Sequence, residues 1–192
     1  LGVEFAKRLG ADDLTAMRAK SADELLAAAK KNTGRVGEGT LDNLCIDGYV
    51  LPESLYKIFA AGRQHNVPLI AGTTKDEDRL FLAGVQAVVQ AMAAIQPKTF
   101  SYEFRRTPDY AVAKKLGCFH GVELPYLFRY FPALLKFNAD DERLSDLMIG
   151  YWTRFAHTGD PNGSGAPAWP TYNASARHVQ VLDAGTQTVQ PV

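Results

Sequence analysis

The sequence predicts an α/β fold in which a mostly parallel sheet is flanked by helices. Three observations favour it: a short apolar run from Val67 to Gly72, an alternating segment from Thr99 to Phe104, and helical periodicity between and after them. A short apolar run bounded by turn residues is typical of a strand that is buried on both faces of a parallel sheet. Helices that alternate with such strands along the chain imply an α/β architecture.

The first forty residues predict three short helices and a loop. Apolar residues four positions apart form one helix face that stops at Gly10, a residue suited to a helix C-terminus. Asp12 or Asp13 is expected to cap a second helix. The run from Ser21 to Glu24 has the spacing of a capping box in front of a third helix. The stretch from Asn32 to Thr40 holds three glycines and is expected to be a loop.

The rest of the chain predicts further helices and a last strand. Pro52 suits the first position of a helix that ends at Gly62, and another helical segment spans about Leu80 to Ala94. The most strongly patterned helix begins near Asp140 and Asp141, whose charges suit a helix N-terminus. The segment from His178 to Leu182 is expected to be the final strand, followed by a polar tail.

Composition excludes several classes of protein. The 192 residues carry 21 basic and 21 acidic side chains, and 46% are hydrophobic, which excludes a disordered tail and a nucleic-acid binder that relies on a basic field. The longest apolar runs are a few residues, whereas about 18 are needed to cross a bilayer. Cys45 and Cys118 are expected to be free buried thiols. The four histidines lack the spacing of a zinc motif, and no dinucleotide fingerprint follows a strand.

Two segments contain candidate catalytic residues. Polar residues from Thr73 to Asp78 follow the first predicted strand, at the sheet edge where ligands and catalytic groups gather in open α/β proteins. Three acids and a lysine after a strand are more often a solvated loop than a site. His120 lies next to Gly121, where backbone can approach closely, although a lone histidine is usually structural. Neither segment identifies a site by itself.

Four motifs occur in one order across most of the chain. They are the stretch from Ile46 to Pro52 continued by Gly72 to Glu77, then His120 to Phe128, then Tyr151 to Asn162, and finally Trp169-Pro170 with the closing strand. This series resembles the type-B carboxylesterases, the family of bacterial para-nitrobenzyl esterases, cholinesterases and related lipases. The resemblance implies the C-terminal part of an α/β-hydrolase fold, with residues 1–192 forming the C-terminal portion of a single domain.

The resemblance also implies a serine-hydrolase triad in the chain order nucleophile, acid, histidine. Glu77 would be the acid and His120 the base. Asp76 and Asp78 are expected to shape the loop, and Glu123 is expected to be a charge beside the site or at a helix end, without a catalytic role. The implied substrates are small-molecule carboxylic esters. No cofactor, metal, nucleic acid or membrane span is implied.

The nucleophile and the oxyanion segment of such a triad are missing from the sequence. None of the serines sits in a GxSxG elbow, and no glycine-rich oxyanion segment precedes the acid. The resemblance therefore implies that the serine is supplied by an N-terminal portion of the same protein, outside this chain. Two features depart from the family pattern: Asp78 stands where glycine is usual, and Glu77 is closer to His120 along the chain than in most members.

Two functions stay open from the sequence. The first is carboxylic ester hydrolysis, with the isolated chain inactive. The second is a catalytically inactive esterase-like binding module, because a fold does not establish a function. The run from Val67 to Ala71 is expected to be an inner strand that needs neighbours on both edges, so we expect the isolated chain to aggregate or to bind its N-terminal portion across a large hydrophobic interface.

Overall fold

The computed structural model describes residues 2–30, 46–77, 79–133, 136–185 and 189–191. These residues form two compact units, Leu1–Ser54 and Leu55–Val192, which are described separately below. The division does not test whether residues 1–192 are the C-terminal portion of one domain, and that assignment stays a prediction.

The first unit contains the three short helices that the sequence predicts. They are α1 (Gly2–Arg8), α2 (Leu14–Arg18) and α3 (Ala22–Lys30). Asp13 is the residue that caps α2, since its side chain accepts from the Ala16 N–H at 2.7 Å. Before α3, the Glu24 side chain accepts from the Ser21 N–H at 2.9 Å, and the Ser21 hydroxyl oxygen accepts from the Glu24 N–H at 3.3 Å. The predicted capping box is therefore confirmed, whereas the loop predicted from Asn32 to Thr40 lies outside the described residues.

The helix expected to start at Pro52 starts three residues later. It is α4 (Leu55–Ala60), so the predicted start is wrong. One carboxylate oxygen of Asp47 accepts from the backbone N–H groups of Tyr49, Val50 and Leu51 at 2.9 to 3.0 Å. An aspartate that binds its own following backbone holds a turn in preference to a helix.

The second unit is built on a four-stranded sheet with the order β1-β2-β3-β4. The strands are β1 (Leu69–Thr74), β2 (Thr99–Phe104), β3 (His178–Leu182) and β4 (Val189–Pro191). β1 and β2 pair in parallel, as do β2 and β3, while β4 is antiparallel to β3. The mostly parallel sheet is confirmed, and β4 is an addition that the sequence analysis described as a polar tail.

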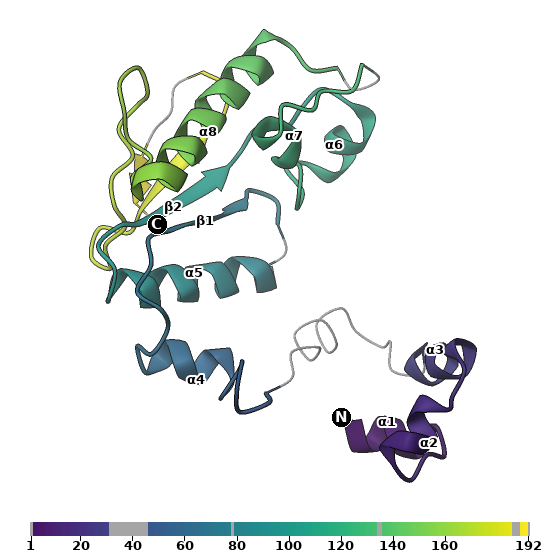
Figure 1. Ribbon diagram of the computed structural model, residues 1–192. Coiled ribbons are helices and arrows are strands. Elements are labelled where there is room, and N and C mark those ends of the chain that lie inside the picture. The colour runs from purple at the N-terminus through teal and green to yellow at the C-terminus, as the bar shows by residue number, and fades with distance from the viewer. Residues whose placement is uncertain (1, 31–45, 78, 134–135, 186–188, 192) are drawn as a thin grey trace. The chain divides into compact units, whose positions relative to one another are not determined.

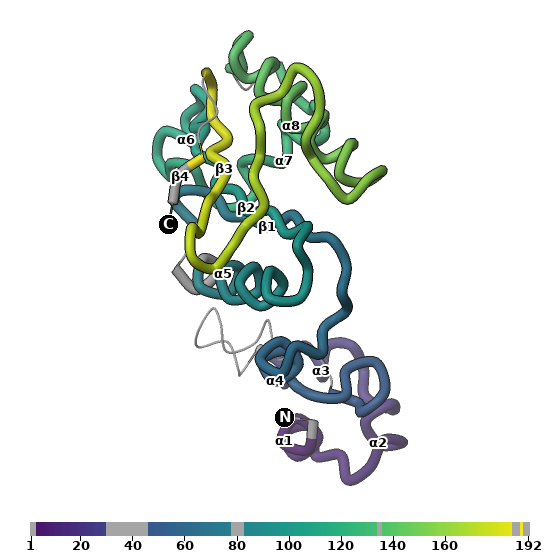
Figure 2. Tube along the Cα trace, turned by 90° about the vertical axis from the view of Figure 1, so that its left-hand side faces the viewer, coloured from purple at the N-terminus to yellow at the C-terminus, as the bar shows by residue number. Residues whose placement is uncertain are grey.

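Helices cover both faces of the sheet. α5 (Arg79–Ala93) lies on one face and α8 (Ala139–Thr158) on the other, as Figures 1 and 2 show. The alternation in β2 explains the arrangement, because successive side chains of a strand point to opposite faces. Phe100, Tyr102 and Phe104 all face α8 and enter the main core, where Tyr102 packs edge-on against Trp152 with ring centroids 5.3 Å apart.

A buried ion pair links the N-terminal end of α8 to neighbouring segments of the second unit. Asn138 caps α8 in a capping box with Asp141, and the Asp141 side chain is fully buried. The same carboxylate accepts from the Arg106 guanidinium at 2.7 Å and from the Tyr126 hydroxyl at 2.7 Å. Tyr126 belongs to α7 (Leu124–Leu127), the helix that follows His120, while α6 (Ala111–Leu116) precedes it. This network therefore fixes α7 relative to α8.

β1 lies at one edge of the sheet. Within the residues that the structure describes, it pairs with β2 and with no other strand. No helix among those residues is long and apolar enough to cross a membrane.

Candidate active site

The ends of β1 and β2 support two loops that meet. The Lys75 N–H, directly after β1, donates to the carbonyl oxygen of Phe104, the last residue of β2, at 2.9 Å. The first loop continues to Glu77, and the second carries Cys118 and His120 after α6. Polar groups therefore gather at the carboxyl ends of parallel strands, as the sequence predicts.

Glu77 and His120 are brought into direct contact although they lie 43 positions apart along the chain. Nδ1 of His120 is hydrogen-bonded to Oε1 of Glu77. The second carboxylate oxygen of Glu77 accepts from the Thr74 N–H at 2.8 Å, which fixes the plane of the carboxylate. The Glu77 side chain is 7% exposed and the His120 side chain 67% exposed. A carboxylate buried in the protein thus holds one side of an imidazole whose ring faces outward.

Asp76 joins the two loops and does not face His120 as an acid. Its carboxylate accepts from the Cys118 N–H at 2.7 Å, and its own N–H donates to the Cys118 carbonyl at 3.1 Å. The prediction that Asp76 shapes the loop is confirmed. Asp78 lies outside the described residues.

Gly117 makes room for this junction. Its φ is +71°, in the left-handed region, and a Cβ at this position would collide with the Asp76 carboxylate. The close approach of backbone predicted at Gly121 is not found there, since a Cβ would have ordinary contact with Leu124 at 3.8 Å. The signal that could have identified Gly117 is its place directly after an amphipathic helix, where glycine commonly ends the helix.

Cys118 is a structural residue of the same junction. Its thiol is fully buried and donates to the Phe104 carbonyl at 3.0 Å. Burial, with smaller contributions from nearby carboxylates, raises the pKa of Cys118 to about 12, so the thiol stays protonated at neutral pH. The prediction of a free buried thiol is confirmed for Cys118, while Cys45 lies outside the described residues.

Glu123 lies directly before α7, three residues after His120. Its Oε2 is buried and has no hydrogen-bond partner in the described part of the chain. Burial and the negative charge of Glu77 raise the pKa of Glu123, against an opposing contribution from backbone N–H groups and His120. Its position agrees with the prediction of a charge beside the site or at a helix end.

The arrangement has the geometry of an acid and base pair. Since a carboxylate accepts hydrogen bonds, Nδ1 carries the ring hydrogen of neutral His120, and Nε2 is then the nitrogen that accepts a proton. No serine of a GxSxG elbow occurs in the sequence. Two of the serines that are described are buried structural residues: Ser145 donates to the Tyr126 carbonyl at 2.6 Å, and Ser101 lies on β2.

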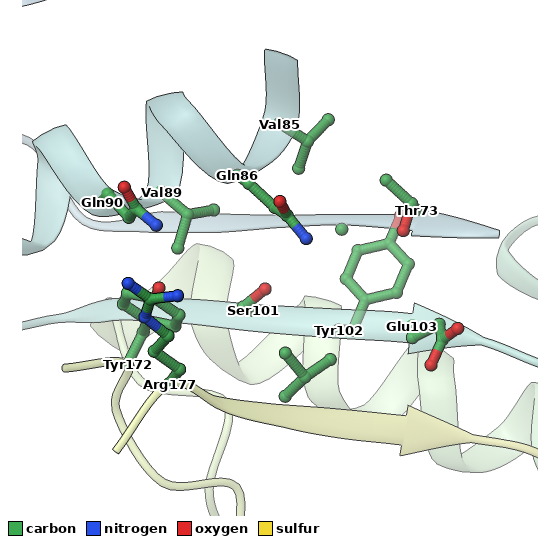
Figure 3. A pocket seen from close by; sticks show the side chains of 12 residues that line it. Thr73, Val85, Gln86, Val89, Gln90, Ser101, Tyr102, Glu103, Tyr172 and Arg177 are labelled. Atoms are coloured by element: carbon green, nitrogen blue, oxygen red, sulfur yellow. The ribbon is translucent and has the colours of Figure 1, made fainter. Parts of the chain in front are cut away.

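A separate cavity lies between α5 and the sheet. It has a volume of about 200 Å³, and Figure 3 shows Val85 and Val89 of α5 facing Ser101 and Glu103 of β2 across it. Neither Glu77 nor His120 lines it. Pockets for small-molecule ligands usually measure about 300 to 1,000 Å³, so this cavity is small for a substrate site.

No group of three or more histidine, cysteine, aspartate or glutamate side chains is placed to hold a metal ion in the described residues.

Comparison with known proteins identifies relatives of this chain. The model of the carboxylesterase family matches residues 77–191. Human cocaine esterase is 33% identical over 109 residues, which are 54% of this chain and 19% of that protein. Liver carboxylesterase of Sus scrofa is 38% identical over 89 residues, which are 43% of this chain and 15% of that protein. The matched region therefore spans less than a fifth of these curated relatives.

Solved structures give the fold. A PNB esterase superposes with a TM-score of 0.80 at 22% identity, covering 98% of this chain and 50% of that one. Carboxylesterase EST55 of Geobacillus stearothermophilus gives a TM-score of 0.71 at 23% identity, covering 97% of this chain and 50% of that one. The predicted α/β-hydrolase fold is confirmed, with this chain corresponding to about half of it. Because the family match covers more than half of its residues, the chain belongs to the carboxylesterase family.

Proposed function

We propose that this chain carries the acid and the base of a serine-hydrolase triad that hydrolyses small-molecule carboxylic esters. Glu77 is the acid, His120 is the base, and the nucleophilic serine lies in an N-terminal portion of the same protein. The observation that carries the proposal is the hydrogen bond between Nδ1 of His120 and Oε1 of Glu77, formed by a buried carboxylate and an exposed ring.

The roles follow from the chemistry of the two groups. A serine hydroxyl is a weak nucleophile until a base removes its proton, and Nε2 of His120 would take that proton as the serine attacks the ester carbonyl. His120 would then return the proton to the departing alcohol and leave an acyl-serine. Water, deprotonated by the same nitrogen, would then attack the acyl carbon, and the imidazolium would return its proton to the serine oxygen as the carboxylic acid leaves. Glu77 keeps the hydrogen on Nδ1 and stabilises the imidazolium that forms twice in this cycle.

Three observations support a nucleophile outside this chain. The sequence has no GxSxG elbow, the chain corresponds to about 50% of the PNB esterase structure, and β1 has an unpaired edge among the described residues. An unpaired edge of a parallel strand is a place for another strand to pair. The N-terminal portion would supply this strand, the serine and the backbone donors that stabilise the oxyanion.

The test compares the chain alone with the chain joined to its N-terminal portion. Each is assayed on a short-chain nitrophenyl ester, and the joined protein is also assayed with His120→Ala. We expect no turnover from the chain alone, turnover from the joined protein, and a loss of about 10³-fold or more in kcat for His120→Ala.

Two results would contradict the proposal. Turnover by the chain alone that is abolished by His120→Ala would place the nucleophile within these 192 residues. The inactive binding module would be favoured instead if the N-terminal portion lacks an elbow serine and the joined protein binds esters without turnover.

A further inference from the structure

A second pocket of the second unit lies beside α8 and does not include Glu77 or His120. Its volume is about 390 Å³, which is within the usual range of about 300 to 1,000 Å³ for small-molecule sites. One face of α8 and the loop after the helix form its walls, with Arg143, Leu147, Gly150 and Arg154 from α8 and Ser164 and Ala166 from the loop. The α8 residues share a face because they recur every three or four positions.

Arg154 is held in place in this pocket with an unused hydrogen-bond donor. Its Nε donates to the Pro161 carbonyl at 2.7 Å, and its guanidinium carbon lies 5.4 Å from the centre of the Tyr151 ring. Its Nη2 is buried and has no acceptor among the described residues. A buried donor without an acceptor loses its hydration and gains nothing in return. The arginine is therefore positioned by its neighbours but not satisfied by them.

Two glycines leave the space that the Arg154 side chain occupies. A Cβ on Gly150 would lie 3.0 Å from Nη1 of Arg154, and a Cβ on Gly163 would lie 2.6 Å from its Cδ. Neither glycine has a positive φ, so backbone conformation does not explain the choice of glycine. Glycine inside a helix is also less stable than alanine, which makes Gly150 unfavourable for α8. Room for the guanidinium is the physical reason for both glycines.

The charges around the pocket leave one positive charge without a partner. Asp146 also lines the pocket, and its carboxylate pairs with Arg129. Arg143 pairs with Asp140. No carboxylate pairs with Arg154 in the part of the chain that the structure describes. The pocket and the ion pairs at its edge therefore carry the charge of Arg154 as their surplus.

We propose that this pocket binds a small organic monocarboxylate. The carboxylate accepts from the Nη donors of Arg154, because the planar guanidinium matches the two oxygens of a carboxylate. Its single negative charge balances the surplus at Arg154. The Ser164 hydroxyl is a further donor, and Leu147 and Ala166 face the apolar part of the ligand. The inference concerns a site separate from Glu77 and His120 and does not depend on ester hydrolysis.

The test is a titration of butyrate into the protein joined to its N-terminal portion, followed by NMR of the butyrate signals. We expect saturable binding that Arg154→Lys weakens by about tenfold or more, because an ammonium keeps the charge but lacks the planar pair of donors. Arg18→Lys, at an exposed arginine of α2 that does not line the pocket, is the matched control and should bind butyrate unchanged. Inorganic phosphate at the same concentration should displace butyrate poorly.

Gly150→Ala provides a second variant if Arg154→Lys does not fold. Alanine favours the helix, and its Cβ would displace Nη1 of Arg154, so butyrate binding should weaken while α8 remains formed. The proposal would be overturned by an absence of butyrate binding, or by binding of unchanged strength in folded variants, since that would place butyrate at another site. Phosphate that displaces butyrate as well as butyrate itself does would overturn the assignment to carboxylates. None of these measurements requires turnover of an ester.

Discussion

Two buried carboxylates in the second unit have opposite surroundings. Asp141 is enclosed: Arg106, Tyr126 and the backbone of Asn138 all donate to its two oxygens, and its side chain has no exposed surface. Glu77 is paired on one side with the Thr74 backbone and on the other with His120, whose ring is 67% exposed. Both are satisfied acids, but only Glu77 connects the protein interior to a group that can exchange a proton with a substrate.

The comparison shows how the same chemical group can be structural or reactive. A carboxylate that is surrounded by donors on rigid elements stabilises its neighbours and has no proton to move. A carboxylate that holds an exposed imidazole leaves the second ring nitrogen as the place where chemistry happens. The predictions below separate the two cases by measuring activity and stability for Glu77, and stability for Asp141 and for the loop junction.

The largest expected effect is on activity. Glu77→Gln in the joined protein should lower kcat by about 10⁴-fold, because an amide no longer fixes the ring tautomer or stabilises the imidazolium. Thermal unfolding of the same variant should change little, since glutamine keeps an oxygen for the Thr74 N–H. Initial rates on a nitrophenyl ester and a melting curve make the test, with Glu142→Gln as the control. A variant that keeps activity within tenfold would refute the role of Glu77.

The next effect is on stability. Asp141→Asn should destabilise the fold by about 3 to 5 kcal/mol, because it leaves the 19%-exposed Arg106 side chain without its counter-ion. Asp140→Asn, one residue earlier and partly exposed, should change stability by less than about 0.5 kcal/mol. Urea unfolding of both variants measures the difference. Equal losses would mean that burial of Asp141 confers no special energetic role.

A smaller effect is expected where the two loops join. Gly117→Ala should destabilise the fold by about 2 to 3 kcal/mol, because alanine resists a φ of +71° and its Cβ would displace Asp76 from the Cys118 N–H. Gly84→Ala on α5, where a Cβ meets no atom within 4 Å, should instead stabilise the helix by up to about 1 kcal/mol. Unfolding midpoints of the pair test this, and a neutral Gly117→Ala would show that the loops are not tightly joined.

Elements with a strong local pattern could be predicted from the sequence. The alternating aromatic residues of β2 and the acidic start and apolar stripe of α8 gave these two elements correctly, because their side chains alone decide which face is buried. β4 was missed because its three residues pair only through the edge of β3. The start of α4 was wrong by three residues: a proline is preferred at the first helical position, but here Pro52 follows the turn held by Asp47 and lies outside the helix.

The candidate site depended on a different kind of information. No periodicity relates Glu77 to His120 across 43 positions, and their pairing was expected from the family resemblance. The junction that holds them, formed by Asp76, Gly117 and Cys118, depends on tertiary geometry, since it needs a left-handed glycine opposite a carboxylate. The family motifs therefore indicated the reactive side chains, whereas the hydrogen bonds and the left-handed glycine that hold their loops together could be identified only from the structure.

The last prediction separates the two carboxylates by pH. Burial alone would raise the pKa of Asp141, but hydrogen bonds from Arg106, Asn138 and Tyr126 outweigh burial and lower it. A carboxyl whose pKa is lower in the folded state stabilises the fold above its usual pKa, and this contribution disappears as the pH falls through the folded value. The stability difference between the joined protein and its Asp141→Asn variant, measured by urea unfolding from about pH 6 down to pH 2, should therefore shrink towards the acid end. A difference that stays constant over this range would mean that the Asp141 network stabilises the fold through packing alone. The negative charge of Asp141 would then contribute nothing to stability, and the contrast with Glu77 would not be electrostatic.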